Sequence, residues 1–175
     1  MRIKVLRGGL RSKNGKGEIG GNQIKVYAKE GTFWFDFGLP MDAYRNFTLL
    51  EMGLLKKLDQ KTLAGMGILP KKRDLDKDVK ILVSHAHADH IGLIYYYKQL
   101  AEADINVEIF SPKDLRELII KRMIIRERNI DFLQKIHFKE LHDFPWTVSP
   151  IKVDHSIDSA YSYIVETSEG TIAYT

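Results

Sequence analysis

The 175-residue sequence contains no cysteine. This absence excludes disulfide bonds and thiolate metal sites. Any transition-metal site in the chain must therefore be built from histidine, aspartate and glutamate side chains, and the positions of those residues become the first thing to examine.

The sequence also lacks a long apolar run. No stretch approaches the roughly 18 consecutive apolar residues that span a bilayer. The N-terminal residues Met1–Lys4 do not have the apolar character of a signal peptide. We therefore expect a cytoplasmic protein that does not contact a membrane.

Charge of either sign is in small excess only. The 27 lysines and arginines against 23 aspartates and glutamates give a formal charge of +4. This balance is compatible with binding a polyanion but is not diagnostic of it. Basic residues do cluster at Lys71–Arg73 and at Lys121–Arg122, although solvated helix faces often have this composition.

The order of expected elements indicates a mixed, layered α/β fold in one domain. Apolar alternation with a glycine turn predicts a hairpin of Gln23–Ala28 and Thr32–Phe37. Periodicity predicts helices at 47–61, 91–101 and 111–127, and a glycine-rich loop at 8–21. Further strands are expected at 3–6, 79–83, 107–110, 148–153, 161–166 and 171–174.

One short segment carries most of the chemistry. Ser84-His85-Ala86-His87-Ala88-Asp89-His90 follows the apolar strand 79–83 directly and concentrates three imidazoles and a carboxylate. In an extended segment residues two apart point the same way, so His85 and His87 can bind one ion. Asp89 and His90, beyond the turn, can face a second ion, as in two-metal hydrolysis. A loop with merely hydrogen-bonded histidines is a poor explanation of this density.

The pattern His-x-His-x-Asp-His after a hydrophobic strand resembles motif 2 of the metallo-β-lactamase superfamily. Asp36, at the end of the second hairpin strand, resembles the motif 1 aspartate that braces the metal-binding loop. His155, in Val-Asp-His-Ser-Ile, resembles motif 3. Within the superfamily the residues are most similar to the β-CASP RNA nucleases, especially ribonuclease J and its archaeal relatives. The segment Glu18–Asn22 also resembles the start of ribonuclease J.

This resemblance implies an αββα sandwich and a metal-dependent phosphodiesterase that hydrolyses RNA by attack of metal-activated water on phosphate. It implies two divalent ions. Zinc is the preferred metal and manganese the alternative, and the donor types suit both. His85, His87 and His155 would bind the first ion, and Asp89 and His90 belong to the second site. Asp89 would also orient the nucleophile as the catalytic carboxylate. Asp154 and Ser156, which flank His155, are expected to orient its ring.

The chain departs from the family pattern at Thr175, where family members continue into Gly-Asp. We expect residues 1–175 to be the N-terminal portion of a metallo-β-lactamase domain, with the sandwich incomplete at the C-terminus and a β-CASP domain beyond it. Alone, this portion is expected to be weakly active or inactive. An exposed sheet edge would favour pairing between chains as a homo-oligomer.

Two other functions remain open at this point. One is a metallo-β-lactamase-fold hydrolase of a small-molecule ester or thioester. The other is a non-catalytic RNA-binding or scaffold relative. The four motif residues from His85 to His90 disfavour the scaffold, because an inactive relative is free to lose them.

Overall fold

The computed structural model describes residues 1–7, 20–41, 53–127 and 136–175. Most of the glycine-rich loop expected at 8–21, and residues 47–52 of the helix expected at 47–61, lie outside these residues. In the remainder of that expected helix, Asp59 caps a separate helix, α3 (Gln60–Gly65), by accepting a hydrogen bond from the Thr62 amide. One continuous helix through Lys61 is therefore the wrong expectation.

The first sheet has the strand order β1-β2-β3-β4-β5-β6. Its strands are β1 (Arg2–Arg7), β2 (Gln23–Ala28), β3 (Gly31–Phe35), β4 (Asp78–Leu82), β5 (Asn106–Phe110) and β6 (His137–Lys139). The first three are antiparallel, which confirms the hairpin, and β3 to β6 run parallel. The carboxyl ends of β3, β4 and β5 therefore meet at one edge, where the loop after β4 begins.

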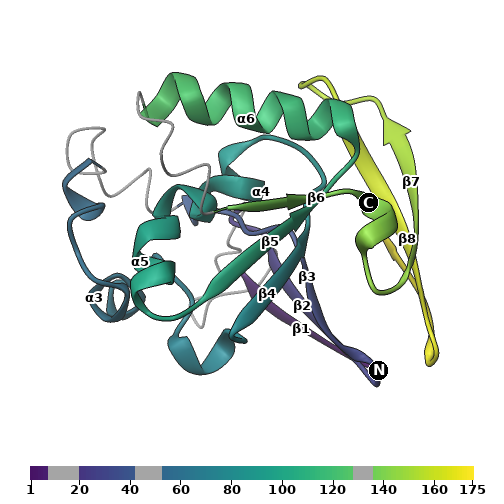
Figure 1. The fold of residues 1–175 in the computed structure, drawn as a ribbon, viewed down its shortest axis with the longest axis horizontal. Coiled ribbons are helices and arrows are strands. Elements are labelled where there is room, and N and C mark those ends of the chain that lie inside the picture. The colour runs from purple at the N-terminus through teal and green to yellow at the C-terminus, as the bar shows by residue number, and fades with distance from the viewer. Residues whose placement is uncertain (8–19, 42–52, 128–135) are drawn as a thin grey trace, which may run out of the picture.

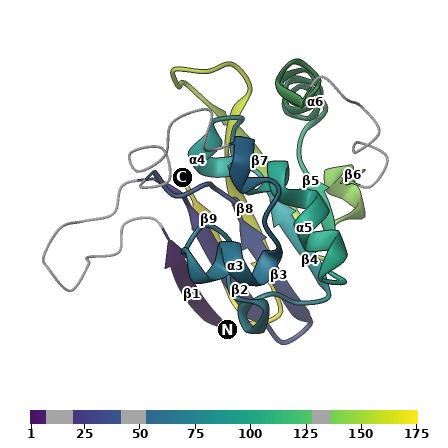
Figure 2. The same ribbon diagram turned by 90° about the vertical axis from the view of Figure 1, so that its left-hand side faces the viewer.

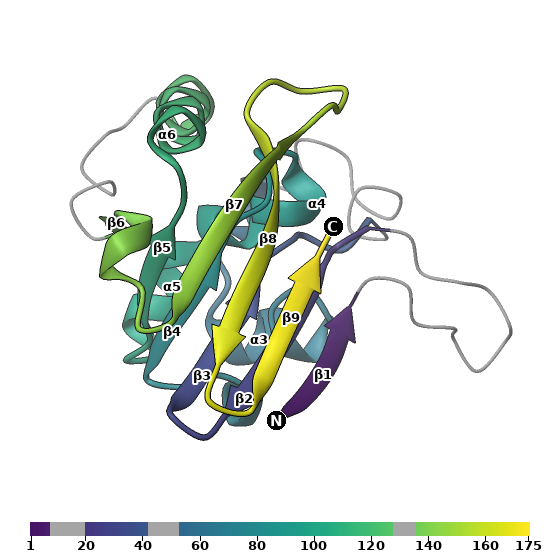
Figure 3. The same cartoon turned by 90° about the vertical axis from the view of Figure 1, so that its right-hand side faces the viewer.

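The second sheet is an antiparallel meander that faces the first (Figures 1 and 3). Its strands are β7 (Thr147–Val153), β8 (Ala160–Thr167) and β9 (Gly170–Tyr174). Aromatic and aliphatic side chains fill the space between the sheets: Val26, Phe33, Phe35, Leu82, Phe110, Phe144, Trp146, Tyr163, Val165 and Ile172. This core fixes the second sheet against the strands that precede the histidine segment.

Helices cover the other face of the first sheet (Figure 2). They comprise α3, α4 (Ala88–Ile91), α5 (Tyr97–Glu102) and α6 (Lys113–Glu127), with short 3-10 turns η1 (Lys72–Asp74) and η2 (Gly92–Tyr96). A further 3-10 turn, η4 (Leu141–Asp143), joins β6 to β7 and packs against the core between the sheets. The helix expected at 111–127 is confirmed. The one expected at 91–101 is interrupted by η2, because the Leu93 amide donates to the Phe37 carbonyl instead of to a carbonyl one turn back.

The fold is thus a mixed, layered α/β fold, as expected, with helices, a mixed sheet and an antiparallel sheet in succession. Within the described ranges no helix covers the outer face of the second sheet. Among the same residues, none of the helices has the length and apolar character needed to cross a bilayer.

A side-chain link joins α6 to the second sheet beside the histidine segment. The Tyr161 hydroxyl lies 2.8 Å from both carboxylate oxygens of Asp114 and donates to that group. The link matters for the site because the Tyr161 amide donates to the Ser84 carbonyl at 2.9 Å. Burial and the Asp114 carboxylate raise the pKa of Tyr161 to about 12, so the hydroxyl stays a donor at neutral pH.

Replacing Tyr161 with phenylalanine should lower the free energy of unfolding by about 1 kcal/mol at neutral pH, because a hydrogen bond to a partly exposed carboxylate is lost. Burial alone would raise the pKa of Asp114, but hydrogen bonds led by that from Tyr161 lower it from 3.8. The contribution is therefore present above pH 3.8 and lost as pH falls through the folded value. Urea unfolding at neutral pH and at a pH below the folded value measures the contribution of this hydrogen bond. Tyr27→Phe is the control, because the hydroxyl of Tyr27 makes none of the described hydrogen bonds. An equal loss in that control would contradict the assignment.

Candidate metal centre

The histidine segment runs from the end of β4 into α4 and is held by backbone pairing with the chain after β3. Phe37 and Leu39 donate their amides to the carbonyls of His90 and Ala88. The approach is close enough that a Cβ added at Gly38 would lie 1.7 Å from the Asp89 carbonyl oxygen. Glycine at this position is therefore required by the contact between the two loops.

Three imidazoles gather at this edge. One ligand nitrogen from each of His85, His87 and His155 lies within 4.8 Å of the others. The Nε2 atoms of His85 and His155 are 3.2 Å apart, and the two rings are nearly perpendicular at 85°. His155 comes from the turn after β7, so the second sheet delivers the third imidazole to the pair that follows β4.

The hydrogen bonds of Ser84 select one tautomer of His85. The Ser84 hydroxyl has a single proton, which it donates to Oδ2 of the buried Asp36 at 2.8 Å. It lies 3.0 Å from Nδ1 of His85 and must accept from that nitrogen. The proton of His85 is thus assigned to Nδ1, which leaves the Nε2 lone pair directed toward His155.

Asp36 is the centre of the hydrogen bonds behind the imidazoles. It is fully buried and accepts from the Ser84 amide at 2.7 Å, from the Ser84 hydroxyl, from the Tyr174 hydroxyl at 2.5 Å and from Nδ1 of His90 at 2.6 Å. Its φ of 57° lies in the left-handed region, which aspartate tolerates better than most residues. A carboxylate bound to the far nitrogen of an imidazole is the usual support of a metal-ligating histidine.

Burial, with the neighbouring positive charges, lowers the pKa of His85 and of His87 and so favours their neutral form. Burial, followed by the charge of His90, lowers the pKa of His85 to about 3. Burial also lowers the pKa of His87, to which the nearby Arg122 charge contributes. Neutral imidazole is the form that binds metal. Protons therefore compete little with a metal ion for these two side chains near neutral pH.

His90 differs from them. Burial alone would lower its pKa, but the hydrogen bond from Nδ1 to Asp36 and the charges of Asp36 and Asp89 raise it. Its Nε2 lies 3.6 Å from Oδ2 of Asp89. The His85 and His90 ring centroids are 3.8 Å apart, so both residues predicted for the second ion lie beside the first group. Asp89 and His90 are not part of the three-residue group itself, and their role as ligands of a second ion remains a prediction.

The chemistry of the donors fits a divalent ion. In a tetrahedral zinc site with Zn–N bonds near 2.05 Å, two ligand nitrogens lie about 3.3 Å apart. The observed 3.2 Å between the Nε2 atoms of His85 and His155 agrees with that spacing. A pocket of about 240 Å³ opens over these atoms, bordered by Ser84, His90, Asp154, Tyr161, Ser162 and Tyr174 among others. It leaves space for a ligand beside the imidazoles.

The residues predicted to orient His155 are placed differently. Asp154 and Ser156 are both exposed, and the hydrogen bonds described for this part of the chain include none from either side chain to the His155 ring. Asp154 borders the pocket. Their predicted supporting role remains a prediction.

Four further residues contact this centre, and none of them was predicted to do so from the sequence. Ser84 and Tyr174 bind Asp36, and the Asn22 amide nitrogen Nδ2 lies 3.3 Å from Nε2 of His90. Arg122 of α6 donates from Nη1 to the Ala86 carbonyl at 3.1 Å. Adjacency to His85 is a signal that could have found Ser84. The other three reach the site only through tertiary packing.

The chain is similar in sequence to known ribonucleases. The chain is 29% identical over 166 residues to ribonuclease J of Mycoplasma genitalium and 27% identical over 166 residues to ribonuclease J of Methanocaldococcus jannaschii, which covers 88% and 90% of the chain. It is 28% identical over 156 residues, 77% of the chain, to ribonuclease Z of Streptococcus suis. The chain resembles ribonuclease J of the metallo-β-lactamase superfamily. The resemblance expected from the motifs is thereby confirmed, at modest identity.

The chain spans only part of these relatives, 28% and 35% of the two ribonucleases J and 50% of the ribonuclease Z. No protein-family model matches it. A solved structure of a Cronobacter sakazakii metallo-β-lactamase aligns with all of the chain and 64% of its own length, at 14% identity and a TM-score of 0.45. A likeness at that level has no bearing on function.

Proposed function

We propose that this chain carries the metal centre of a divalent-metal-dependent phosphodiesterase that hydrolyses RNA. The observation that carries the proposal is the convergence of His85, His87 and His155, with the Nε2 atoms of two of them at metal-ligand spacing. The sequence similarity to ribonucleases J and Z supports RNA as the substrate. Zinc is the first ion to test and manganese the second.

In this proposal His85, His87 and His155 hold the ion, which supplies a Lewis acid for the phosphate and lowers the pKa of water. Asp36 orients the ring of His85 through Ser84 and binds the ring of His90 directly. The side chain of Asp89 is 31% exposed, and its Oδ2 lies 3.6 Å from Nε2 of His90. There it can accept a proton from an attacking water and orient it.

The direct test is hydrolysis of a labelled single-stranded RNA by the chain after chelation and after restoring zinc or manganese. We expect cleavage in the restored samples only, at the low rate expected of this portion alone, and its loss in Asp89→Asn, which keeps the shape of the side chain but cannot accept the proton. Glu140→Gln is the matched control, because Glu140 pairs with Arg116 and lies in none of the contacts of the centre.

Parallel assays on a small ester and a thioester separate the alternative enzyme function from this one. Metal-dependent turnover of those substrates with no cleavage of RNA would replace the proposal. Metal binding without hydrolysis of any substrate would favour a non-catalytic role for the chain as tested.

A further inference from the structure

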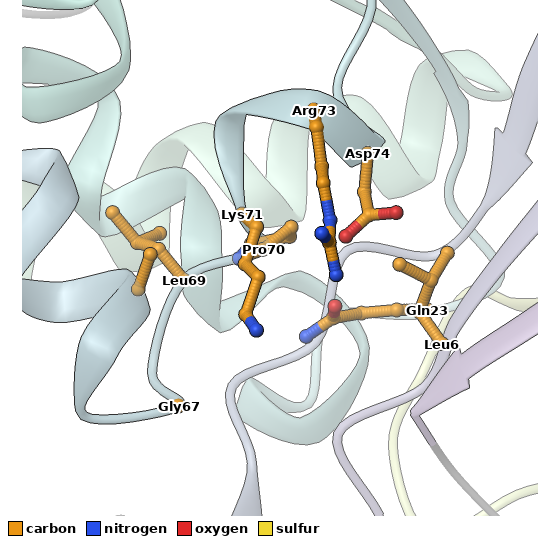
Figure 4. A pocket seen from close by; sticks show the side chains of 9 residues that line it. Leu6, Gln23, Gly67, Leu69, Pro70, Lys71, Arg73 and Asp74 are labelled. Atoms are coloured by element: carbon orange, nitrogen blue, oxygen red, sulfur yellow. The ribbon is translucent and has the colours of Figure 1, made fainter.

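A second pocket, of about 250 Å³, lies away from the three histidines, between the start of β2 and the segment that joins α3 to β4. Figure 4 shows the Lys71 ammonium, the Arg73 guanidinium and the Gln23 amide directed into the same space. Leu6 and Leu69 supply apolar walls beside these groups. We call this site the basic pocket.

The positive charges of the basic pocket are not neutralised by the described residues. No ion pair within the described ranges involves Lys71 or Arg73, and both residues are exposed. The acidic groups nearby have other cations: Asp74, which also borders the pocket, accepts from Lys4 at 2.7 Å. Two free cations around a shallow hollow therefore favour an anion, and the planar fork of arginine suits the oxygens of a phosphate.

The basic pocket is connected to the metal centre through two consecutive residues. Asn22 donates its amide to the Asp89 carbonyl, and its side chain faces His90. The next residue, Gln23, is 2% exposed and donates from Nε2 to the Gly38 carbonyl at 2.9 Å while it lines the basic pocket. Since successive side chains in an extended segment point to opposite sides, Asn22 faces the metal centre while Gln23 lines the basic pocket.

We propose that the basic pocket binds a backbone phosphate of single-stranded RNA other than the phosphate that is cut; this inference rests on the proposed function. Single-stranded RNA carries a phosphate at every nucleotide, so a strand lying across the metal centre presents further phosphates to neighbouring cations. Lys71 and Arg73 bind the phosphate, and the apolar walls contact the sugar. Such a contact fixes the position of the strand without selecting its sequence.

The test measures RNA binding by the whole chain in chelator, where no cleavage takes place, by fluorescence anisotropy over a range of salt concentrations. The variant K71Q/R73Q removes the two charges of the basic pocket. The matched control K72Q/K77Q removes two charges from exposed residues nearby that do not line it. Oligoadenylate and oligouridylate are the probes, with inorganic phosphate as the competing small anion.

We expect K71Q/R73Q to bind both oligonucleotides about tenfold more weakly and to reduce the magnitude of the slope of log affinity against log salt by roughly 0.7, the contribution of one phosphate contact on a single strand. The control should retain the slope of the unmodified chain. An equal loss in the control, or no RNA binding by the unmodified chain, would overturn the inference. A change confined to inorganic phosphate, with RNA affinity unaltered, would overturn it too.

Failure of the two proposals can be told apart. If the metal-loaded chain shows not even slow hydrolysis of RNA but K71Q/R73Q shows the expected loss of binding, the proposed catalytic function is wrong for this chain and the basic pocket is supported. If the chain hydrolyses RNA and K71Q/R73Q binds as the unmodified chain does, only the basic pocket is wrong. Thermal unfolding of both variants checks that the fold is retained.

Discussion

Replacing His85 and His87 together with alanine should reduce the metal bound to the purified chain from about one ion per molecule to near zero. Two of three ligands are then lost, and His155 alone, exposed in the turn after β7, cannot compete with water for the ion. Elemental analysis of the chain after incubation with zinc or manganese and removal of excess metal measures the effect. Calorimetric titration of the metal-free chain gives the corresponding affinities.

His142→Ala is the matched control for metal binding, because its side chain is 80% exposed and contacts the equally peripheral Asp143. This variant should bind as much metal as the unmodified chain. Retention of metal in the double variant would place the ion elsewhere and remove the basis of the proposed function. Equal loss in the control would show that nonspecific surface binding had been measured.

The parts of the fold that sequence predicted well are those fixed by local pattern. The hairpin of β2 and β3 follows from alternation around a glycine with a φ of 144°, and α6 follows from Ser-Pro before a long helical stretch. The interruption of the helix after α4 could not be predicted in this way. It depends on a backbone hydrogen bond between Leu93 and Phe37, residues whose proximity is a property of the packed sheet.

The candidate site likewise contains residues that the sequence pattern predicted and residues that only tertiary packing brings to it. Spacing at the end of one strand indicated that His85 and His87 can bind one ion. The family motif pointed to His155, which lies 70 residues from His85 in sequence. Tyr174 has no such signal. It reaches Asp36 because β9 packs over β3, where its ring stacks on Phe35 at 4.6 Å between centroids. Arg122 likewise depends on how α6 lies over the histidine segment.

Removing the carboxylate of Asp36 should have the largest effect on stability. Asp36→Ala leaves the Ser84 amide, the Tyr174 hydroxyl and His90 without their buried acceptor, and alanine is strained at a φ of 57°. We expect the free energy of unfolding to fall by about 3–5 kcal/mol. Asp36→Asn keeps one acceptor oxygen and tolerates the backbone, so roughly half that loss is expected.

Urea unfolding of the metal-free chain measures both variants, with Asp143→Ala as the control, since that half-exposed carboxylate should contribute less than about 0.5 kcal/mol. The pH dependence separates an electrostatic role from packing. His90 has a raised pKa in the folded chain, owing to Asp36 against the effect of burial, so its contribution is present below 6.5 and lost as pH rises through the folded value. The difference between the unmodified chain and Asp36→Asn should therefore be larger below pH 6.5 than in alkaline solution. A difference independent of pH would show that Asp36 acts by hydrogen-bonding neutral groups, and that its charge does not hold the proton on His90.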